Sequence, residues 1–177
     1  MPSEVLVPGL AATVLLLIAT LSIVGVISTS MSMAVNSIRE SYESSYKRSS
    51  RITIQQVNAS YSGESLEVNL TVLNNGPYPI YKFEACDLII EYFSSSGSLK
   101  SLRLSYASDW TVERVLLVVE SYGVSFTEHP LIDTGEVGLI RAHATVGDLD
   151  AAKPLKVVFA THYGSRDSRW VAVNAQG

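Results

Sequence analysis

The sequence has a single cysteine, few charged residues and no basic excess, and each shortage removes a class of protein. Cys86 is the only cysteine among 177 residues, so no disulfide can form within the chain. Charged residues make up 17% of the chain and the formal net charge is −4, which does not fit a nucleic-acid-binding protein. A hydrophobic content of 47% is too high for a disordered chain. We therefore expect a folded protein with no nucleic-acid partner.

Charge is also missing from one long N-terminal stretch, between Val5 and Ile38. Within it, Val5–Ile27 is almost continuously apolar, and at about 1.5 Å per residue it spans a bilayer core of about 30 Å. A secretory signal peptide is the alternative, but such peptides have basic residues before a core of about 7–15 residues. Here no lysine or arginine precedes the core. We predict a retained single-pass membrane anchor.

The charges near this anchor give only a weak indication of its orientation. All of the nearest basic residues lie on its C-terminal side, and the positive-inside rule would place that side in the cytoplasm. They begin a dozen positions beyond the apolar core, however, and acidic residues are interspersed among them: Arg39, Lys47, Arg48 and Arg51, with Glu40 and Glu43.

After the apolar core, residues 28–50 are small and polar with one thin apolar stripe. Its members recur at steps of three and four residues, which is one face of a helix: Met31, Val35, Ile38, Tyr42 and Tyr46. This pattern predicts a helical stalk that packs against another helix, or equally a solvated linker. We place a transmembrane helix and stalk in residues 1–50 and a separate domain in residues 51–177.

From Arg51 onward the apolar period changes from helical to two. Leu66, Val68, Leu70 and Val72 alternate with polar residues, as in a half-buried strand. Further strands are predicted at Ile52–Ala59, Cys86–Phe93, Leu99–Tyr106, Arg114–Val119, Val137–Val146, Leu155–Tyr163 and Trp170–Asn174. Turn residues separate them, at Ser62-Gly63, Asn75-Gly76-Pro77, Ser94–Gly97, Asp133–Gly135 and Gly164. About eight short strands at this spacing predict an immunoglobulin-like antiparallel β-sandwich, preceded by the long helix.

Motifs of catalysis are missing: there is no glycine-rich phosphate loop, no paired-cysteine zinc spacing, no HExxH and no GxSxG. His143 and His162 fall on predicted strands and could meet across a sheet to hold a metal, which would suit an exterior enzyme. The simpler interpretation, which we favour, makes them surface or rim histidines. We expect no catalytic residue, no metal and no cofactor.

Other reactive or aromatic residues have structural interpretations too. Cys86 has apolar neighbours and is expected to be a buried structural thiol. Asp133–Glu136 is predicted as a turn with a glutamate that opens a strand, and Arg166–Arg169 as a solvated charged hairpin. Trp110 and Trp170 are expected in the core or at its rim.

Two tripeptides match the N-glycosylation sequon, Asn58-Ala59-Ser60 and Asn69-Leu70-Thr71. Such triplets also arise by chance, so they only favour a location outside the cell. Asn58 and Asn69 are the candidate modification sites.

One order of features carries a family resemblance. Behind the apolar helix and serine-rich stalk come Ile52-x-Ile54, Leu66-x-Val68-x-Leu70-x-Val72, the Asn74–Gly76 turn, Cys86–Ile90, Asp109–Val112, Asp133–Glu136 and Val157–Gly164. This order resembles the FlaF/FlaG-type accessory proteins of the archaellum, the rotating archaeal filament, and more loosely archaellins and archaeal type IV pilins. Each piece is short, and only their order is specific.

The resemblance implies a non-enzymatic membrane protein whose sandwich lies outside the cell. It would form homodimers, assemble with its sister protein and bind the S-layer protein, as the static element of the motor. A pilin-like or archaellin-like filament subunit is the alternative. Those relatives have basic residues and a glycine before the apolar segment, which Met1–Glu4 lacks, and this difference favours the accessory protein.

Overall fold

The computed structural model describes residues 17, 20–38, 51–117 and 122–175. They belong to two separate compact units, an N-terminal helix and a β-sandwich, which we describe one at a time. The domain boundary predicted at residue 50 lies outside the described residues, as do Tyr42 and Tyr46 of the predicted stalk.

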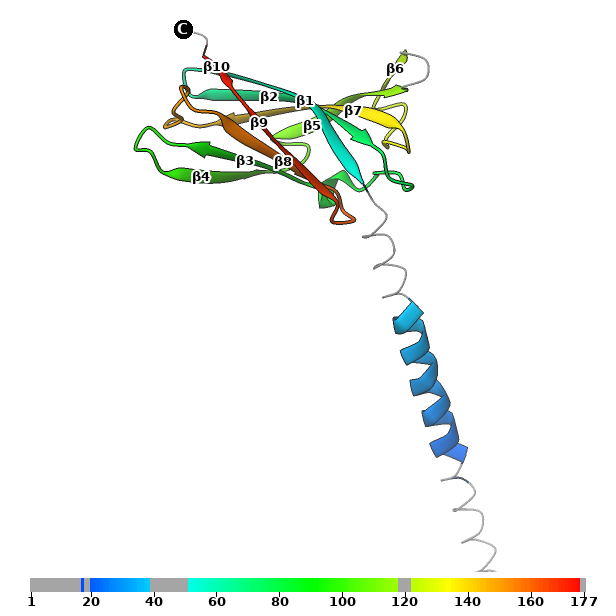
Figure 1. Cartoon of the computed structure of the whole chain (residues 1–177). Helices are drawn as coiled ribbons and strands as arrows, with labels where there is room; N and C mark the ends of the chain where they lie inside the picture. The colour runs from blue at the N-terminus through cyan, green and yellow to red at the C-terminus, as the bar shows by residue number, and fades with distance from the viewer. Residues whose placement is uncertain (1–16, 18–19, 39–50, 118–121, 176–177) are drawn as a thin grey trace, which may run out of the picture. The chain divides into compact units, whose positions relative to one another are not determined.

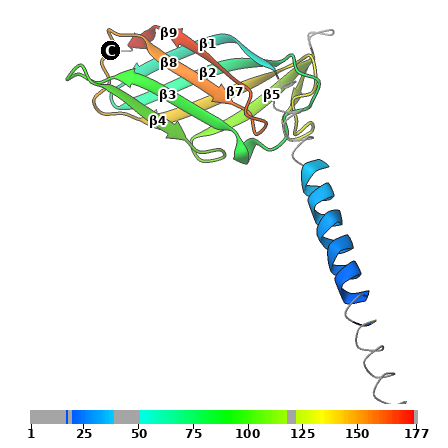
Figure 2. The same ribbon diagram turned by 60° about the horizontal axis from the view of Figure 1, so that its bottom comes forward.

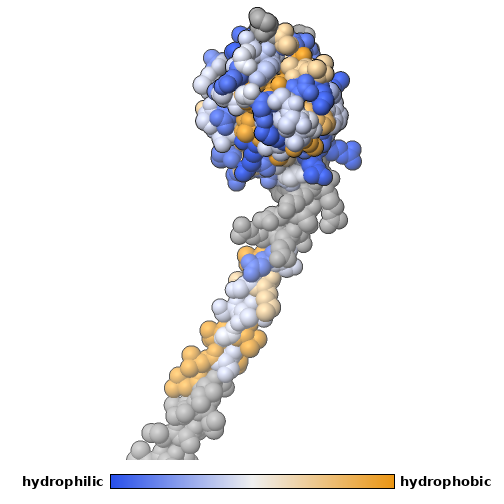
Figure 3. Space-filling model, turned by 90° about the vertical axis from the view of Figure 1, so that its left-hand side faces the viewer, coloured by the Kyte–Doolittle hydropathy of each residue, from blue (hydrophilic) through white to orange (hydrophobic). Residues whose placement is uncertain are grey.

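The helix Thr20–Ile38 is long and apolar enough to cross a membrane. Its large apolar side chains have exposed fractions of 57% to 69%, and many of them are visible in orange in Figure 3. Thr29 donates its hydroxyl hydrogen bond to the Gly25 carbonyl at 2.8 Å, which satisfies a polar group that lipid could not. Most of the predicted anchor Val5–Ile27 precedes the described residues, so its N-terminal half stays a prediction.

The sandwich has two sheets, one of six strands and one of four, drawn as two layers in Figure 1. The six-stranded sheet has the order β10-β1-β2-β7-β5-β6, from β1 (Ile52–Ser62), β2 (Ser65–Asn74), β5 (Trp110–Leu117), β6 (Tyr122–Ser125), β7 (Glu136–Thr145) and β10 (Val173–Ala175). The four-stranded sheet has the order β4-β3-β8-β9, from β3 (Asp87–Phe93), β4 (Leu99–Leu104), β8 (Leu155–Ala160) and β9 (Arg166–Val171). A short 3-10 helix, η1 (Phe83–Ala85), precedes β3.

The predicted β-sandwich behind an apolar helix is confirmed, with three local differences. The short strand β6 was not predicted. The predicted last strand is divided between β9 in one sheet and β10 in the other, and β10 pairs with β1 in parallel, whereas the other ladders are antiparallel. The hairpin predicted at Arg166–Arg169 is misplaced, because these residues begin β9 and the turn comes earlier, at Gly164, which has a φ of 82°. Their predicted exposure is confirmed for Arg166, Ser168 and Arg169.

The period of two seen in the sequence places the core between the sheets. Leu66, Val68, Leu70 and Val72 of β2 are at most 2% exposed, as the alternation predicts. Asn74 is the next residue on this inward face and is 1% exposed. Its side-chain amide donates to the carbonyls of Tyr78 (2.8 Å) and Ile132 (2.9 Å).

Asn74 also shapes the crossover that carries the chain from the six-stranded to the four-stranded sheet. Its side-chain oxygen accepts the Gly76 backbone N–H at 3.1 Å, which forms the turn. Asn75 and Gly76 tolerate positive φ but do not adopt it here: the described glycines with positive φ are Gly63, Gly97, Gly135 and Gly164. The turn is therefore set by the Asn74 side chain and not by glycine.

Trp110 joins the two sheets in the middle of the core. It lies on β5 of the six-stranded sheet, is 1% exposed, and donates its indole N–H to the Leu104 carbonyl of β4 at 3.2 Å. Its ring meets Phe159 of β8 edge-to-face, with centroids 5.7 Å apart. Trp170, by contrast, is 53% exposed on β9, so one tryptophan is in the core and the other at the rim.

We expect Trp110→Phe to lower the free energy of unfolding by about 2 kcal/mol, because it leaves a cavity and removes the hydrogen bond to Leu104. Trp170→Phe is the matched control and should change it by less than about 0.5 kcal/mol. Denaturant unfolding of the full chain, followed by circular dichroism, measures both. Equal effects of the two substitutions would contradict the central role of Trp110.

Candidate functional site

The two histidines proposed as metal ligands do not meet. His143 is exposed on β7 of the six-stranded sheet, on the side opposite the buried Ala142 and Ala144. His162 follows β8 of the four-stranded sheet. Among the described residues, no group of three or more histidine, cysteine, aspartate or glutamate side chains could hold a metal ion. The hypothesis of a joint site at these two histidines is wrong, because the strands that carry them belong to different sheets.

His162 is instead enclosed by aromatic rings. Its ring centroid lies 3.8 Å from that of Tyr163 and 4.9 Å from that of Tyr81. Both ring nitrogens are buried without a hydrogen-bond partner among the described residues. Burial lowers the pKa of His162, and the positive charge of Lys82 lowers it further. The imidazole is therefore held neutral, as a packing group of this end of the sandwich.

Cys86 is a buried structural thiol, as the sequence predicted. It is 4% exposed, and its sulfur donates to the Lys82 carbonyl at 3.4 Å. Burial raises the pKa of this thiol to about 12. Since the thiolate is the nucleophilic form, Cys86 is not suited to nucleophilic chemistry near neutral pH.

Glu136, which the sequence predicted only as the residue that opens a strand, is a buried carboxylate that organises the turn before β7. Glu136 is 7% exposed and accepts the Asp133 backbone N–H at 2.7 Å. The same carboxylate oxygen lies 3.0 Å from Nε2 of His129. The predicted turn at Asp133–Glu136 is confirmed, with Gly135 at a φ of 81°. Asp133 and His129 both belong to the loop before β7, so their contacts with Glu136 hold this loop in place. The pair of His129 and Glu136 is therefore structural.

Side chains of β9 close the exposed edge of β1. Asp167 accepts the Ile54 backbone N–H at 2.8 Å, and Arg169 donates to the Ile54 carbonyl at 3.1 Å and to the Gln55 carbonyl. The ladder between β1 and β2 has an irregularity at this point, between Ile54 and Gln56. Nothing in the local sequence marks these contacts, since they depend on β9 of the four-stranded sheet packing beside β1 of the six-stranded sheet.

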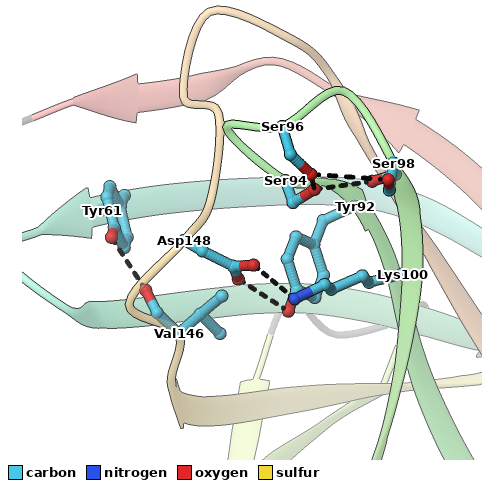
Figure 4. Close-up of polar contacts among 8 residues, drawn as sticks. All are labelled: Tyr61, Tyr92, Ser94, Ser96, Ser98, Lys100, Val146 and Asp148. Carbon is cyan, nitrogen blue, oxygen red and sulfur yellow. Dashed lines mark hydrogen bonds and ion pairs between the residues drawn. The ribbon is translucent and has the colours of Figure 1, made fainter.

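At the end of the sandwich opposite Ile52, a polar cluster fastens the long connection between β7 and β8 (Figure 4). Asp148 of this connection accepts hydrogen bonds from Lys100 of β4 and, at 3.3 Å, from the Tyr92 hydroxyl of β3. The Tyr61 hydroxyl of β1 donates to the Val146 carbonyl at 2.8 Å. Both sheets therefore hold the same connection.

A serine-rich hairpin between β3 and β4 lies beside this cluster (Figure 4). The Ser94 and Ser96 hydroxyls are 2.9 Å apart, and Ser94 also donates to the Ser98 carbonyl at 3.1 Å. The Ser95 backbone N–H donates to the Asp148 carbonyl at 2.7 Å. This hairpin and the connection between β7 and β8 thus form one joined surface, which we call the distal end.

The two sequon asparagines are direct neighbours in the structure. Asn58 of β1 pairs with Asn69 of β2, and both are exposed on the outer face of the six-stranded sheet. Asn69 donates to Glu67 at 3.3 Å on the same face. Sequence reasoning treated the two sequons as separate, because the pairing follows only from the register of the hairpin.

The outer faces of the two sheets differ in character. On the six-stranded sheet, Arg141 lies 2.9 Å from Glu67 and 3.5 Å from Glu113, in a face that also carries both sequon asparagines. On the four-stranded sheet, a shallow depression of about 380 Å³ is lined by Ile89, Glu91, Lys156, Val158, Arg166, Asp167 and Ser168.

No family model matches the sequence, and no curated protein matches it either. Solved structures do resemble the chain. The archaeal flagellum of Methanospirillum hungatei strain JF1 is similar at a TM-score of 0.50 and 15% identity, over 94% of this chain and 93% of that one. At this identity the likeness concerns the fold, and it extends over helix and sandwich together.

Two further similar structures come from Sulfolobus acidocaldarius. One is the archaellum periplasmic stator protein complex FlaF and FlaG, with a TM-score of 0.47 and 15% identity over 68% of this chain and 88% of that one. The other is the archaellum periplasmic stator protein FlaG, with a TM-score of 0.45 and 17% identity over 69% of this chain and 99% of that one. The resemblance to archaellum proteins predicted from the sequence is confirmed as a similarity of fold by the match to the archaeal flagellum.

The polar cluster of Figure 4 predicts a dependence of stability on pH. Lys100 holds the pKa of Asp148 below its ordinary value of 3.8. The ionised pair therefore stabilises the fold above that pH, and its contribution is lost as the pH falls through the lower pKa of the folded state. We expect Asp148→Asn to be less stable than the wild type at neutral pH and to approach it in acid.

Unfolding midpoints of the full chain between pH 7 and pH 2 measure this effect. Lys100→Met removes the cation of the same ion pair. It should reduce the loss of stability at low pH in the same way as Asp148→Asn. If the wild-type and Asp148→Asn curves stay parallel over this range, the ion pair does not contribute.

Proposed function

We propose that the chain is a membrane-anchored, extracytoplasmic structural component of an archaellum motor. In this role the helix holds the protein in the cell membrane, and the sandwich lies outside the cell, where it binds the S-layer protein. The chain self-associates and also assembles with a sister protein of FlaF/FlaG type. It then serves as a stator, the static element against which a filament turns.

The observation that carries this proposal is the combination of two units with different surfaces. The helix Thr20–Ile38 exposes apolar side chains all along its length, which only lipid or another helix would cover. The outer face of the six-stranded sheet carries Arg141, Glu67 and Glu113, and no group of three or more metal-ligating side chains occurs among the described residues. An anchor with a binding module is the simplest role for such a chain, and the order of sequence features favours an archaellum accessory protein within that class.

The distal end is the expected S-layer contact. The chain enters the sandwich at Ile52, and strands of about 7 to 11 residues carry it to the opposite end, roughly 25 to 35 Å away at about 3.3 Å per residue. The serine-rich hairpin is exposed there at Ser95 and Ser96. The exposed hydroxyls of these serines suit polar contacts with a protein lattice.

We expect the full chain in detergent to sediment with isolated S-layer sheets. Ser95→Trp, at the distal end, should weaken this binding roughly tenfold, because a bulky ring would hold the two surfaces apart. Thr134→Trp is the matched control, since Thr134 is also exposed but lies in the turn before β7, at the other end. Wild-type protein that stays in the supernatant, or equal losses in both variants, would contradict this function.

A filament subunit of pilin or archaellin type is the second candidate. The similarity to the M. hungatei flagellum favours it, because that match extends over helix and sandwich together. Its prediction differs from that of the stator: the chain would be the main protein of filaments sheared from cells. Quantitative mass spectrometry of sheared filaments and of membranes separates the two functions by the fraction that holds the chain.

We also propose that Asn58 and Asn69 carry N-linked glycans. Both are exposed, and the register of β1 and β2 places them directly opposite each other. Two glycans would therefore cover one area of the six-stranded sheet. Because this area lies within a regular hairpin, attachment would have to precede folding.

Peptide mass mapping of protein from its native cells should show glycan mass at both asparagines. Ser60→Ala should remove the mass only at Asn58, and Thr71→Ala only at Asn69, since each change destroys one sequon and leaves its asparagine in place. Unmodified peptides from wild-type cells would contradict the proposal.

A further inference from the structure

The four-stranded sheet has two edge strands of six residues, β4 (Leu99–Leu104) and β9 (Arg166–Val171). β9 packs beside β1 of the six-stranded sheet, which leaves β4 as the edge strand with no described strand on its outer side. Figure 2 shows it along the outer margin of the four-stranded sheet, with only β3 beside it. The edge of β1 is covered by β10 and by the side chains of Asp167 and Arg169. β10 and β6, the edges of the six-stranded sheet, have only three and four residues.

The register shows which groups of β4 are unpaired. The Ser94 backbone N–H donates to the Ser98 carbonyl at 2.8 Å, which continues the antiparallel ladder of β3 and β4. Hydrogen-bonded pairs alternate along such a ladder, so the N–H and C=O groups of Leu99, Ser101 and Arg103 point away from β3. No side chain among the described residues hydrogen-bonds to these backbone groups. Unpaired groups of this kind are ready partners for another strand.

Charged side chains often protect such an edge, but here each is neutralised within its own chain. The Lys100 ammonium is held by Asp148 at the inner side of the sheet. Arg103 donates to Asp87 at 2.7 Å on the outer face. The edge also has no proline and no irregularity in its ladder with β3. Leu99, the first residue of β4, is 58% exposed.

We propose that β4 pairs with β4 of a second copy, antiparallel and centred on Ser101. This inference rests on the proposed function, whose self-association it assigns to one surface. The pairing joins two four-stranded sheets into one continuous sheet across a twofold axis. Leu99 then lies opposite Arg103 of the second copy, Ser101 opposite Ser101, and Lys100 opposite Leu102, so no like charges face each other.

The neighbouring registers are less favourable. A register centred on Lys100 places two ammonium groups directly opposite each other, and one centred on Arg103 does the same with two guanidinium groups. In a register centred on Leu102, Leu99 would face Ser105, whose backbone N–H already donates to the Asp109 carboxylate at 2.8 Å. The register centred on Ser101 is therefore the one that pairs all three open residues.

Cysteine cross-linking of the full chain tests both the surface and the register. In the proposed pairing, the two Ser101 Cα atoms are about 5.5 Å apart, within the range of a disulfide. We expect Ser101→Cys to give a cross-linked dimer under mild oxidation in detergent. The wild type should give none, because Cys86 is buried. Ser168→Cys is the matched control, an exposed serine on the outer face of the opposite edge strand β9, and should also give none.

Charge substitutions at Leu99 test the register independently. Leu99→Arg would place two guanidinium groups opposite each other twice in the dimer and should weaken dimerisation roughly tenfold, measured by analytical ultracentrifugation. Leu99→Glu faces Arg103 of the second copy and should leave the dimer intact or strengthen it. A disulfide in Ser168→Cys but not in Ser101→Cys, or equal effects of the two Leu99 substitutions, would overturn the proposal.

The outcomes also separate this inference from the proposed function. A Ser101→Cys dimer in a chain that does not sediment with S-layer sheets would keep the edge pairing and reject the attachment. Sedimentation without a Ser101→Cys dimer would keep the attachment and reject the edge pairing.

Discussion

The burial of one face of each sheet against the other, around Trp110, is the interaction on which the sandwich depends. The indole is almost fully buried, bonds to the opposite sheet through Leu104 and packs edge-to-face on Phe159. Each inward residue of β2 removes apolar surface from water in the same layer, and burial of this kind is the main favourable term in folding. The sheets can part only if this layer is exposed.

The buried layer holds the two sheets together, but it does not cover the edge strands or hold the connections. These parts of the structure depend on other contacts. Side chains from both sheets hold the connection between β7 and β8: Tyr92 of β3 bonds to Asp148, and Tyr61 of β1 bonds to the Val146 carbonyl. After β9 the chain crosses to the six-stranded sheet as β10, and polar side chains of β9 bond to the backbone of β1 at the point where the ladder is irregular. β4 has no such protection, which is why it stands out as an interaction surface.

Two reactive side chains lie in surroundings that keep them uncharged. Burial raises the pKa of the Cys86 thiol, and burial together with the nearby charge of Lys82 lowers the pKa of His162. The outer face of the six-stranded sheet carries the paired sequons, and glycans there would cover it. The distal end and the β4 edge would then stay uncovered, and these are the surfaces that we propose for the S-layer protein and for a second copy.

The sequence by itself determined the two units, the strand regions and the character of the core, because these follow from the local period of apolar residues. Leu66–Val72 is the clearest case, and the same alternation places Asn74 inside. Glycine at Gly63, Gly97, Gly135 and Gly164 marked real turns, since positive φ is a local requirement. The buried thiol at Cys86 could likewise be predicted from its neighbours.

Only the tertiary structure decided which strands became neighbours, because pairing depends on contacts between residues far apart in the chain. It separated His143 from His162 by placing their strands in different sheets, and brought Asn58 beside Asn69. It also turned Arg166–Arg169 from an expected hairpin into a strand that closes the β1 edge. No local pattern encodes these outcomes, since a residue's own sequence neighbourhood specifies which side of a strand it takes but not which strand lies beside it.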